Sequence, residues 1–218
     1  MKSLDAPRDV RGDREIDAGG RLLVPGLIDL RADLGEPGHT ERETIASGLA
    51  SAVAGGFTSV VVMPSTDPTI DQVEVVDYVL ARAREAAKAR VLPAASLSVS
   101  RAGERLAEMA KLANAGCVLF TDVDRPVRDS QLLRYALETA DDIGVPVATH
   151  AEDPTLSLGG IMHEGFVSAR LGLAGIPFTA EVVGVARDIA LAELTGARIH
   201  LHHISAAGSV ELIRHGEA

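Results

Sequence analysis

Strand-like and helix-like runs alternate six times along this chain, and this alternation restricts the fold more than any other feature. The runs that favour strands are short and apolar; they are Leu22–Asp33, Thr58–Pro64, Arg90–Ser98, Cys117–Val123, Val145–Glu152 and Arg198–Ser205. The runs that favour helices follow each of them, and several end at glycine; they are Thr40–Ala54, Val73–Lys88, Glu104–Ala115, Ser130–Ile143, Ala180–Thr195 and Gly208–Arg214. Such alternation predicts a parallel sheet with right-handed crossovers.

Two α/β architectures fit this order, a doubly wound open sheet and a (β/α)8 barrel. The barrel is favoured because no Gly-x-Gly-x-x-Gly motif follows a predicted strand, and because polar residues gather at the C-terminal ends of strands, where barrel active sites are built. Six units are two short of closure, so we expect an incomplete (β/α)8 barrel. Its first strand, with the apolar run Leu23–Leu30, should be buried. Unpaired first and sixth strands would need a cover, from a partner, a second copy or a longer product.

Composition narrows the class of protein. The 218 residues are enough for one large domain with a sizeable core, and 46% hydrophobic residues is typical of a globular chain. A net charge of −10 argues against nucleic acid and anionic membranes as partners. The single Cys117, and a polar Met1–Asp13 segment unlike a signal peptide or a membrane span, predict a cytoplasmic protein.

Four stretches of sequence stand out together; they are Val24–Asp29, Glu43–Ile45 with Ala54–Thr58, Met63–Pro68, and His150–Asp153 with Gly159–Gly165. Together they resemble the bacterial type of dihydroorotase, in the amidohydrolase superfamily, and are less similar to hydantoinases and allantoinases. The resemblance implies that residues 1–20 are the remnant of an N-terminal β-sandwich or a linker. It implies further that residues 21–218 are a partial amidohydrolase barrel, and that two more βα units follow Ala218.

In the family that the chain resembles, zinc activates water to attack the ring amide of dihydroorotate, but the metal-binding positions are altered here. The family's His-x-His pair falls on Arg31 and Asp33. An arginine side chain cannot coordinate a metal, because it keeps its proton in a protein. The bridging carboxylate of the fourth strand aligns with Val123, or with Asp122 or Asp124 after a shift of one residue.

Two of the family's metal-binding histidines are retained, as His150 and His203. Two histidines make a poor zinc site when three or four ligands are needed, so we expect them to be vestigial ligands without a metal. His200 and His202 alternate with His203 on one strand, and are therefore expected to face the helix layer. No cofactor is expected; zinc would be needed only by an active hydrolase.

The predicted pocket is formed by Arg31, Asp33, Ser65 and Asp122. By the resemblance, the arginine that clamps the substrate carboxylate is replaced by Gly35, and an asparagine that contacts the substrate is replaced by Ser65. We expect Arg31 to replace the metal cation and to pair with Asp33 or Asp122, since a buried carboxylate without a partner is costly.

These losses predict a non-catalytic dihydroorotase-like protein of pyrimidine biosynthesis that acts as a binding or scaffold subunit. The resemblance makes aspartate transcarbamoylase the leading candidate partner, because some bacteria pair it with inactive dihydroorotase-like chains; a homo-oligomer is the other expectation. The alternative is a divergent metal-dependent cyclic amidohydrolase that converts dihydroorotate to carbamoyl aspartate. It would use His150, His203, Asp33 and Asp122.

Overall fold

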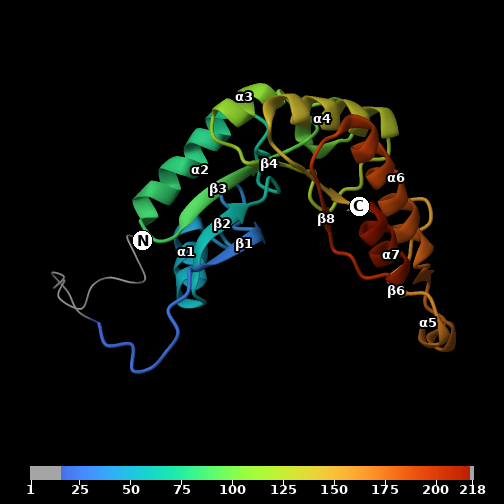
Figure 1. Cartoon of the computed structure of the whole chain (residues 1–218), viewed down its shortest axis with the longest axis horizontal. Coiled ribbons are helices and arrows are strands. Elements are labelled where there is room, and N and C mark those ends of the chain that lie inside the picture. Colours follow the sequence, from blue (N-terminus) through green and yellow to red (C-terminus); the bar gives the residue numbers. More distant parts are fainter. Residues whose placement is uncertain (1–15, 217–218) are drawn as a thin grey trace.

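The computed structural model describes residues 16–216, and its centre is a six-stranded parallel sheet. The strands lie in the order β1-β2-β3-β4-β5-β8. They are β1 (Leu27–Ala32), β2 (Phe57–Val62), β3 (Arg90–Ala95), β4 (Leu119–Phe120), β5 (Val147–His150) and β8 (Ile199–His202). Figure 1 shows the described part of the chain as an arch, open on one side, with β1 and β8 on opposite arms. The predicted fold, a partial barrel with six strands, is confirmed.

Helices follow the strands and cover the convex face of the sheet (Figure 1). They are α1 (Ile45–Ala54), α2 (Val73–Ala86), α3 (Met109–Asn114), α4 (Ser130–Ile143), α6 (Thr179–Thr195) and α7 (Ala207–Gly216). Alternate strand residues such as Val60, Val62 and Phe120 join helix residues such as Leu133 and Leu137 in one buried core. None of the helices within residues 16–216 is long and apolar enough to cross a membrane.

The segment between β5 and α6 holds a small substructure that the sequence did not reveal. β6 (Met162–His163) and β7 (Gly175–Ile176) form a separate two-stranded parallel sheet, and the short helix α5 (Phe166–Leu171) connects them. In Figure 1, α5 lies at the far end of the arm that carries α6 and α7. Strands of two residues are too short to show an alternating pattern, so sequence periodicity cannot predict them.

The first predicted strand is shorter than expected. β1 begins at Leu27, whereas residues 16–26 are exposed and form neither strand nor helix. The predicted N-terminal remnant, residues 1–20, lies mostly outside the described residues, and its described part, residues 16–20, adds nothing to the sheet.

The helix predicted over Glu104–Ala115 is limited to α3. The chain before it forms a 3-10 turn over Val99–Arg101, and Ser98 makes an isolated antiparallel bridge with Leu106. These local contacts occupy backbone groups that a longer helix would use. The loop after β3 is therefore long, and it reaches over the end of the sheet where the candidate site lies.

The concave face of the sheet carries a second, smaller cluster of buried side chains: Val61, Met63, Ala94, Leu119, Val123 and Ala148. Beside it, an apolar cavity of about 430 Å³ extends from Leu30 of β1, past Leu92 of β3, to His202 of β8. The sheet thus separates a large outer core from a small inner cluster, and the inner cluster fills only the part of the concave face beside this cavity.

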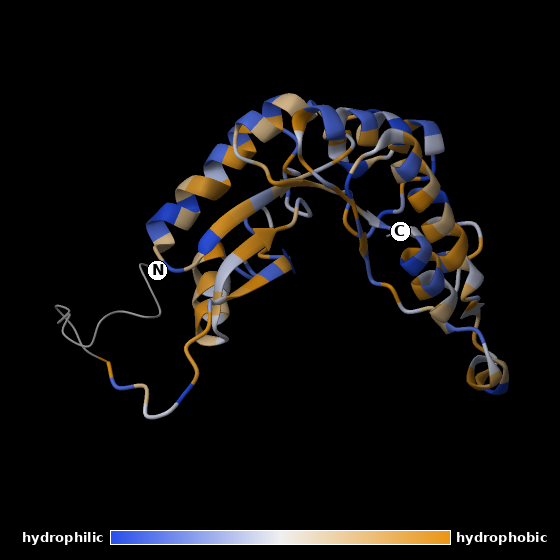
Figure 2. Ribbon diagram, viewed as in Figure 1, coloured by the Kyte–Doolittle hydropathy of each residue, from blue (hydrophilic) through white to orange (hydrophobic). Residues whose placement is uncertain are grey.

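β1 and β8 are the edge strands of the described sheet, as predicted. The expected burial of the first strand is wrong, because Leu27, Ile28 and Leu30 are 54%, 58% and 52% exposed. β1 has β2 as its only neighbour in the described sheet, and the concave face beside it is open. Figure 2 shows hydrophobic stretches on the strands inside the arch.

Candidate functional site

A polar cavity of about 540 Å³ lies where β1 and β2 end and the loops after β3 and β4 meet. Three of the four predicted pocket residues line it: Arg31, Asp33 and Ser65. The Ser65 hydroxyl donates a hydrogen bond to Asp33, and the Arg31 guanidinium lies 4.0 Å from the same carboxylate. That distance suits an ion pair but is too long for a hydrogen bond. The expected Arg31–Asp33 pairing is therefore a loose contact between charges.

Asp122, the fourth predicted pocket residue, lines a neighbouring cavity instead. It is buried, and its carboxylate accepts hydrogen bonds from the backbone N–H groups of Leu97 and Ser98, both at 3.0 Å, and from the Ser98 hydroxyl at 2.5 Å. Burial raises the pKa of Asp122 by more than these hydrogen bonds lower it. Asp122 holds the loop after β3, and the expected pairing with Arg31 is not formed.

The histidines of β5 and β8 gather on the concave face. The two strands pair in register, which places His150 beside His202. The ring centroids of His150 and His203 are 5.2 Å apart, and those of His202 and His203 are 5.8 Å apart. His203 has a positive φ of 62°. This left-handed conformation ends the strand alternation and lets the His203 ring approach both neighbours.

The prediction that His200 and His202 face the helix layer is wrong for His202 and holds in part for His200. Both rings line the inner apolar cavity, with centroids 4.7 Å apart, but His200 also borders, with Leu201, the space between β8 and the helices α6 and α7. The alternation was counted from His203, whose backbone breaks it. The alternation of apolar and polar residues over 199–202 by itself predicts that His200 and His202 lie on one face of the strand and Ile199 and Leu201 on the other.

Several buried nitrogen atoms here have no hydrogen-bond partner among the described residues: Arg31 Nε, His150 Nδ1 and both ring nitrogens of His202. Burial, followed by the neighbouring charges of His200 and His203, lowers the pKa of His202 to about 4. Burial and then the charge of Arg31 also lower the pKa of His203. His202 is therefore neutral at pH 7, with one N–H donor and one acceptor nitrogen.

Besides Arg42, two cationic side chains that the sequence reasoning missed, Arg101 and Arg125, also line the polar cavity. Arg101, whose side chain is only 10% exposed, pairs with Asp124, and its Nε donates a hydrogen bond to the backbone carbonyl of Asp122 at 3.3 Å. Arg125 donates to the backbone carbonyl of Arg101 at 3.2 Å. Both arginines stand in loops, and Arg101 itself has a positive φ of 56°. Irregular backbone of this kind leaves no periodic signal in the sequence.

The residues present do not fit the zinc site that the sequence resemblance implies. Val123, aligned with the bridging carboxylate, is buried and has no donor atom. Arg31 places a permanent cation at the end of β1. Across residues 16–216, no group of three or more His, Cys, Asp or Glu side chains is arranged to hold a metal ion. His150 and His203 alone fall short of the three protein ligands of a catalytic zinc site.

Comparison with known proteins assigns the family. Residues 20–209 match the family described as Dihydro-orotase-like. The chain belongs to this family. A relative from Syntrophobacter fumaroxidans named Dihydroorotase is 53% identical over 217 residues, which cover 99% of this chain and 49% of the relative. One of the same name from Pelobacter propionicus is 47% identical over 216 residues, with 99% and 50% covered. The chain thus spans about half the length of the curated relatives it matches.

Solved structures that are similar to this dihydro-orotase-like chain have the same partial-barrel arrangement over the aligned region. L-hydantoinase (dihydropyrimidinase) from Arthrobacter aurescens aligns with a TM-score of 0.77 at 21% identity, over 96% of this chain and 48% of the hydantoinase. Dihydroorotase from Saccharomyces cerevisiae, solved with 5-fluoroorotic acid, aligns with a TM-score of 0.62 at 16% identity, over 88% and 52%. These likenesses establish an amidohydrolase-type barrel fold that is incomplete in the described residues.

Proposed function

We propose that this dihydro-orotase-like chain is a non-catalytic member of its family, serving pyrimidine biosynthesis as a binding or scaffold subunit. The observation that carries the proposal is Arg31 at the end of β1, beside Asp33 and across the cavity from Val123. A hydrolytic zinc site needs several donor groups that can lose a proton. Arg31 and Val123 supply none, and the guanidinium repels a metal cation from the same space.

Zinc content and hydrolysis, measured together, test the proposal. We expect less than about 0.1 zinc per chain in protein purified without a metal-affinity tag, and no hydrolysis of dihydroorotate above background. The relative from Syntrophobacter fumaroxidans, assayed in parallel, is the comparison enzyme. Zinc near one ion per chain together with hydrolysis that His150→Ala abolishes would overturn the proposal.

A reconstruction sharpens the same test. The triple variant Arg31→His, Asp33→His, Val123→Asp places donor groups at the three altered positions, alongside the retained His150 and His203. We expect its zinc content to rise towards about one ion per chain. The matched variant that also carries His150→Ala should lose that zinc. A triple variant that folds but binds no zinc would show that the three substitutions are not what removed the metal site.

We further propose aspartate transcarbamoylase as the partner, with self-association as the alternative outcome. The half-exposed Leu27, Ile28 and Leu30 on the edge strand β1 support a protein partner, because exposed apolar strand edges favour association. The buried, free thiol of Cys117 fits a reducing cytoplasmic setting.

Size-exclusion chromatography with light scattering tests the partner. We expect a complex of the full chain with the aspartate transcarbamoylase catalytic chain from the same genome. Leu30→Glu should weaken that complex strongly, whereas Val53→Glu, on the half-exposed face of α1, should not. A monodisperse monomer that forms no complex with the transcarbamoylase would contradict the proposal.

A second function, a divergent cyclic amidohydrolase that opens dihydroorotate with zinc, is favoured by one pair of observations. The rings of His150 and His203 lie only 5.2 Å apart, and relatives at about 50% identity are named Dihydroorotase. Asp33, directly after β1, is the carboxylate that such a site would take from that strand. The zinc and hydrolysis measurements above separate the two functions directly.

A further inference from the structure

We propose that the space between Arg31 and the imidazoles of His150, His202 and His203 is an anion site that takes the carboxylate group of a small organic acid. The substitutions at the end of β1 would then have converted a site for a metal cation into a site for an anion. This inference rests on the proposed function, since in an active hydrolase the same histidine nitrogens would coordinate zinc instead of donating to an anion.

The first support is a group of nitrogen atoms without partners. Arg31 Nε, His150 Nδ1 and both ring nitrogens of His202 are buried and make no hydrogen bond with the described residues. Buried polar groups in proteins are nearly always paired, and leaving one unpaired costs about 1–3 kcal/mol. A guanidinium only donates, and a neutral imidazole donates from one nitrogen. A ligand that satisfies the Arg31 guanidinium and the imidazole N–H groups must therefore bring acceptor oxygens.

The second support is the convergence of these side chains from two edges of the sheet. His150 and His202 are register partners on β5 and β8, and the His203 ring lies 5.2 Å from His150 and 5.8 Å from His202. Arg31 comes from the end of β1, on the opposite arm. The cavity on the concave face runs from Ile28 and Leu30 of the same strand to His202, so the two arms face one another across it.

The third support is that no nearby carboxylate of the described residues accepts a hydrogen bond from Arg31 or from the rings of the three histidines. Asp33 accepts the Ser65 hydroxyl and stays 4.0 Å from Arg31, while Asp124 pairs with Arg101. Glu152 lies 3.8 Å from His150 Nε2, too far for a hydrogen bond. The carboxylates of residues 16–216 therefore leave the Arg31 guanidinium without a hydrogen-bonded partner.

The chemistry of Arg31 selects the kind of anion. A guanidinium presents a planar fork that matches the two oxygens of a carboxylate in a bidentate contact. The adjoining cavity of about 540 Å³, lined also by Arg42, Arg101 and Arg125, leaves room for the body of a small acid and for a second carboxylate. The ligand class is therefore a small mono- or dicarboxylate.

Titration of the metal-free full chain with malonate tests the inference. We expect heat of binding by calorimetry, and shifts of the His150, His202 and His203 side-chain NMR resonances while that of His215, exposed on α7, stays in place. Arg31→Met should weaken binding about 10- to 100-fold, the loss expected for hydrogen bonds to a charged group. Arg31→Lys, which keeps the charge without the planar fork, should fall in between.

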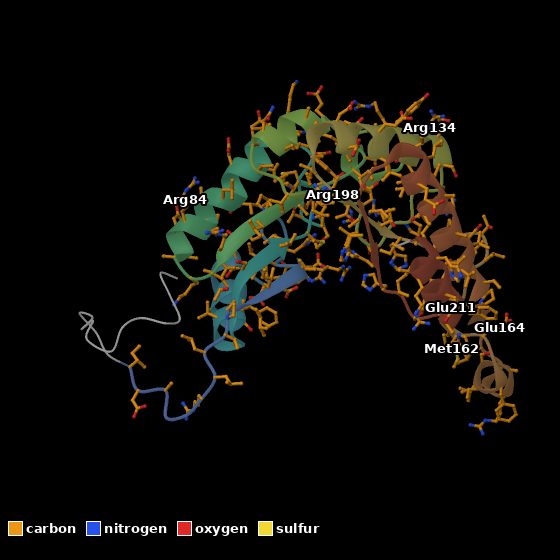
Figure 3. The ribbon with its side chains drawn as sticks, viewed as in Figure 1. Arg84, Arg134, Met162, Glu164, Arg198 and Glu211 are labelled. Carbon is orange, nitrogen blue, oxygen red and sulfur yellow. The ribbon has the colours of Figure 1, made fainter. Side chains whose placement is uncertain are left out.

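Arg84→Met is the matched control, because Arg84 is exposed on α2, away from the concave face (Figure 3). Its malonate affinity should equal that of the unmodified chain. Equal affinity in Arg31→Met, or unmoved His resonances, would overturn the site. Phosphate or chloride binding as tightly as malonate would overturn the assignment to a carboxylate. Bound zinc would refute the proposed function. A chain that contains no zinc and does not bind malonate would refute the anion site alone.

Discussion

The two faces of the six-stranded sheet differ in how much of their surface the described residues cover. On the convex face, Val60, Val62 and Phe120 are fully covered by helices, and the core there is continuous from α1 to α4. On the concave face, Ile28 and Leu30 stay more than half exposed, and several buried nitrogen atoms have no hydrogen-bond partner among residues 16–216. In the described residues, the convex side is therefore covered by helices, whereas the concave side is left open with half-exposed apolar side chains.

This difference separates stability from function. A covered helix–sheet interface supplies the burial that stabilises the fold. A face with half-exposed leucines and unpaired donors adds little to stability, but it offers apolar surface and hydrogen-bond donors to a ligand or partner. Substitutions on the two faces should therefore have distinct consequences.

The largest contrast is expected from the same substitution made on each face. Leu133→Ala, at a fully buried position of α4, should lower the free energy of unfolding by about 2–5 kcal/mol. Leu30→Ala, at a position 52% exposed, should lower it by about 1 kcal/mol or less. Urea denaturation followed by circular dichroism measures both. Equal losses would mean that the concave face is as well packed in solution as the convex one.

A smaller effect is expected at Glu36, which ties the loop after β1 to the convex side. Its buried carboxylate accepts hydrogen bonds from Ile45 N at 2.8 Å, Tyr78 Oη at 2.9 Å and Arg82 Nε at 2.9 Å. Glu36→Gln should cost about 2 kcal/mol, since hydrogen bonds to a charged group are lost or weakened. Glu85→Gln is the control, because Glu85 is the other, exposed partner of Arg82 and should have little effect.

The pH dependence of stability checks the same residue. Burial raises the pKa of Glu36, but the hydrogen bonds from Ile45, Tyr78 and Arg82 outweigh it, and the pKa lies below its usual 4.5. A lowered folded-state pKa stabilises the fold above the unfolded-state value and loses that contribution as the pH falls through the folded-state value. The stability difference between the unmodified chain and Glu36→Gln should therefore shrink below about pH 4.5. A constant difference down to pH 3 would refute this assignment.

The smallest effect is expected at the mouth of the concave side. Asp33 is 47% exposed and lies 4.0 Å from Arg31, so Asp33→Asn should change the free energy of unfolding by less than about 1 kcal/mol. Thermal unfolding at low and high salt measures it. A loss of several kcal/mol would show that Asp33 and Arg31 form a tight buried pair. The Arg31 guanidinium would then not be free to bind an added carboxylate.

Much of the architecture follows from local patterns. The alternation of short apolar runs and helical runs gives the six parallel strands in order, and the edge positions of β1 and β8 follow from the count of units. Gly144 after α4 and Gly196 after α6 end their helices in the left-handed conformation that the sequence suggested. Errors concentrate where strands are two residues long or where loops carry positive φ, as at β4 and Arg101.

By itself, the sequence determined the sheet type, the family and the altered end of β1, because these depend on residue identity and short-range periodicity. Tertiary structure alone decided that Asp122 binds Ser98 rather than Arg31, that Arg101 enters the cavity, and that His202 faces inward. Ser98 and Asp122 are 24 residues apart and meet only because parallel strands end at the same edge of the sheet. The positive φ of His203 and the 5.2 Å distance between its ring and that of His150 are likewise visible only in the tertiary structure.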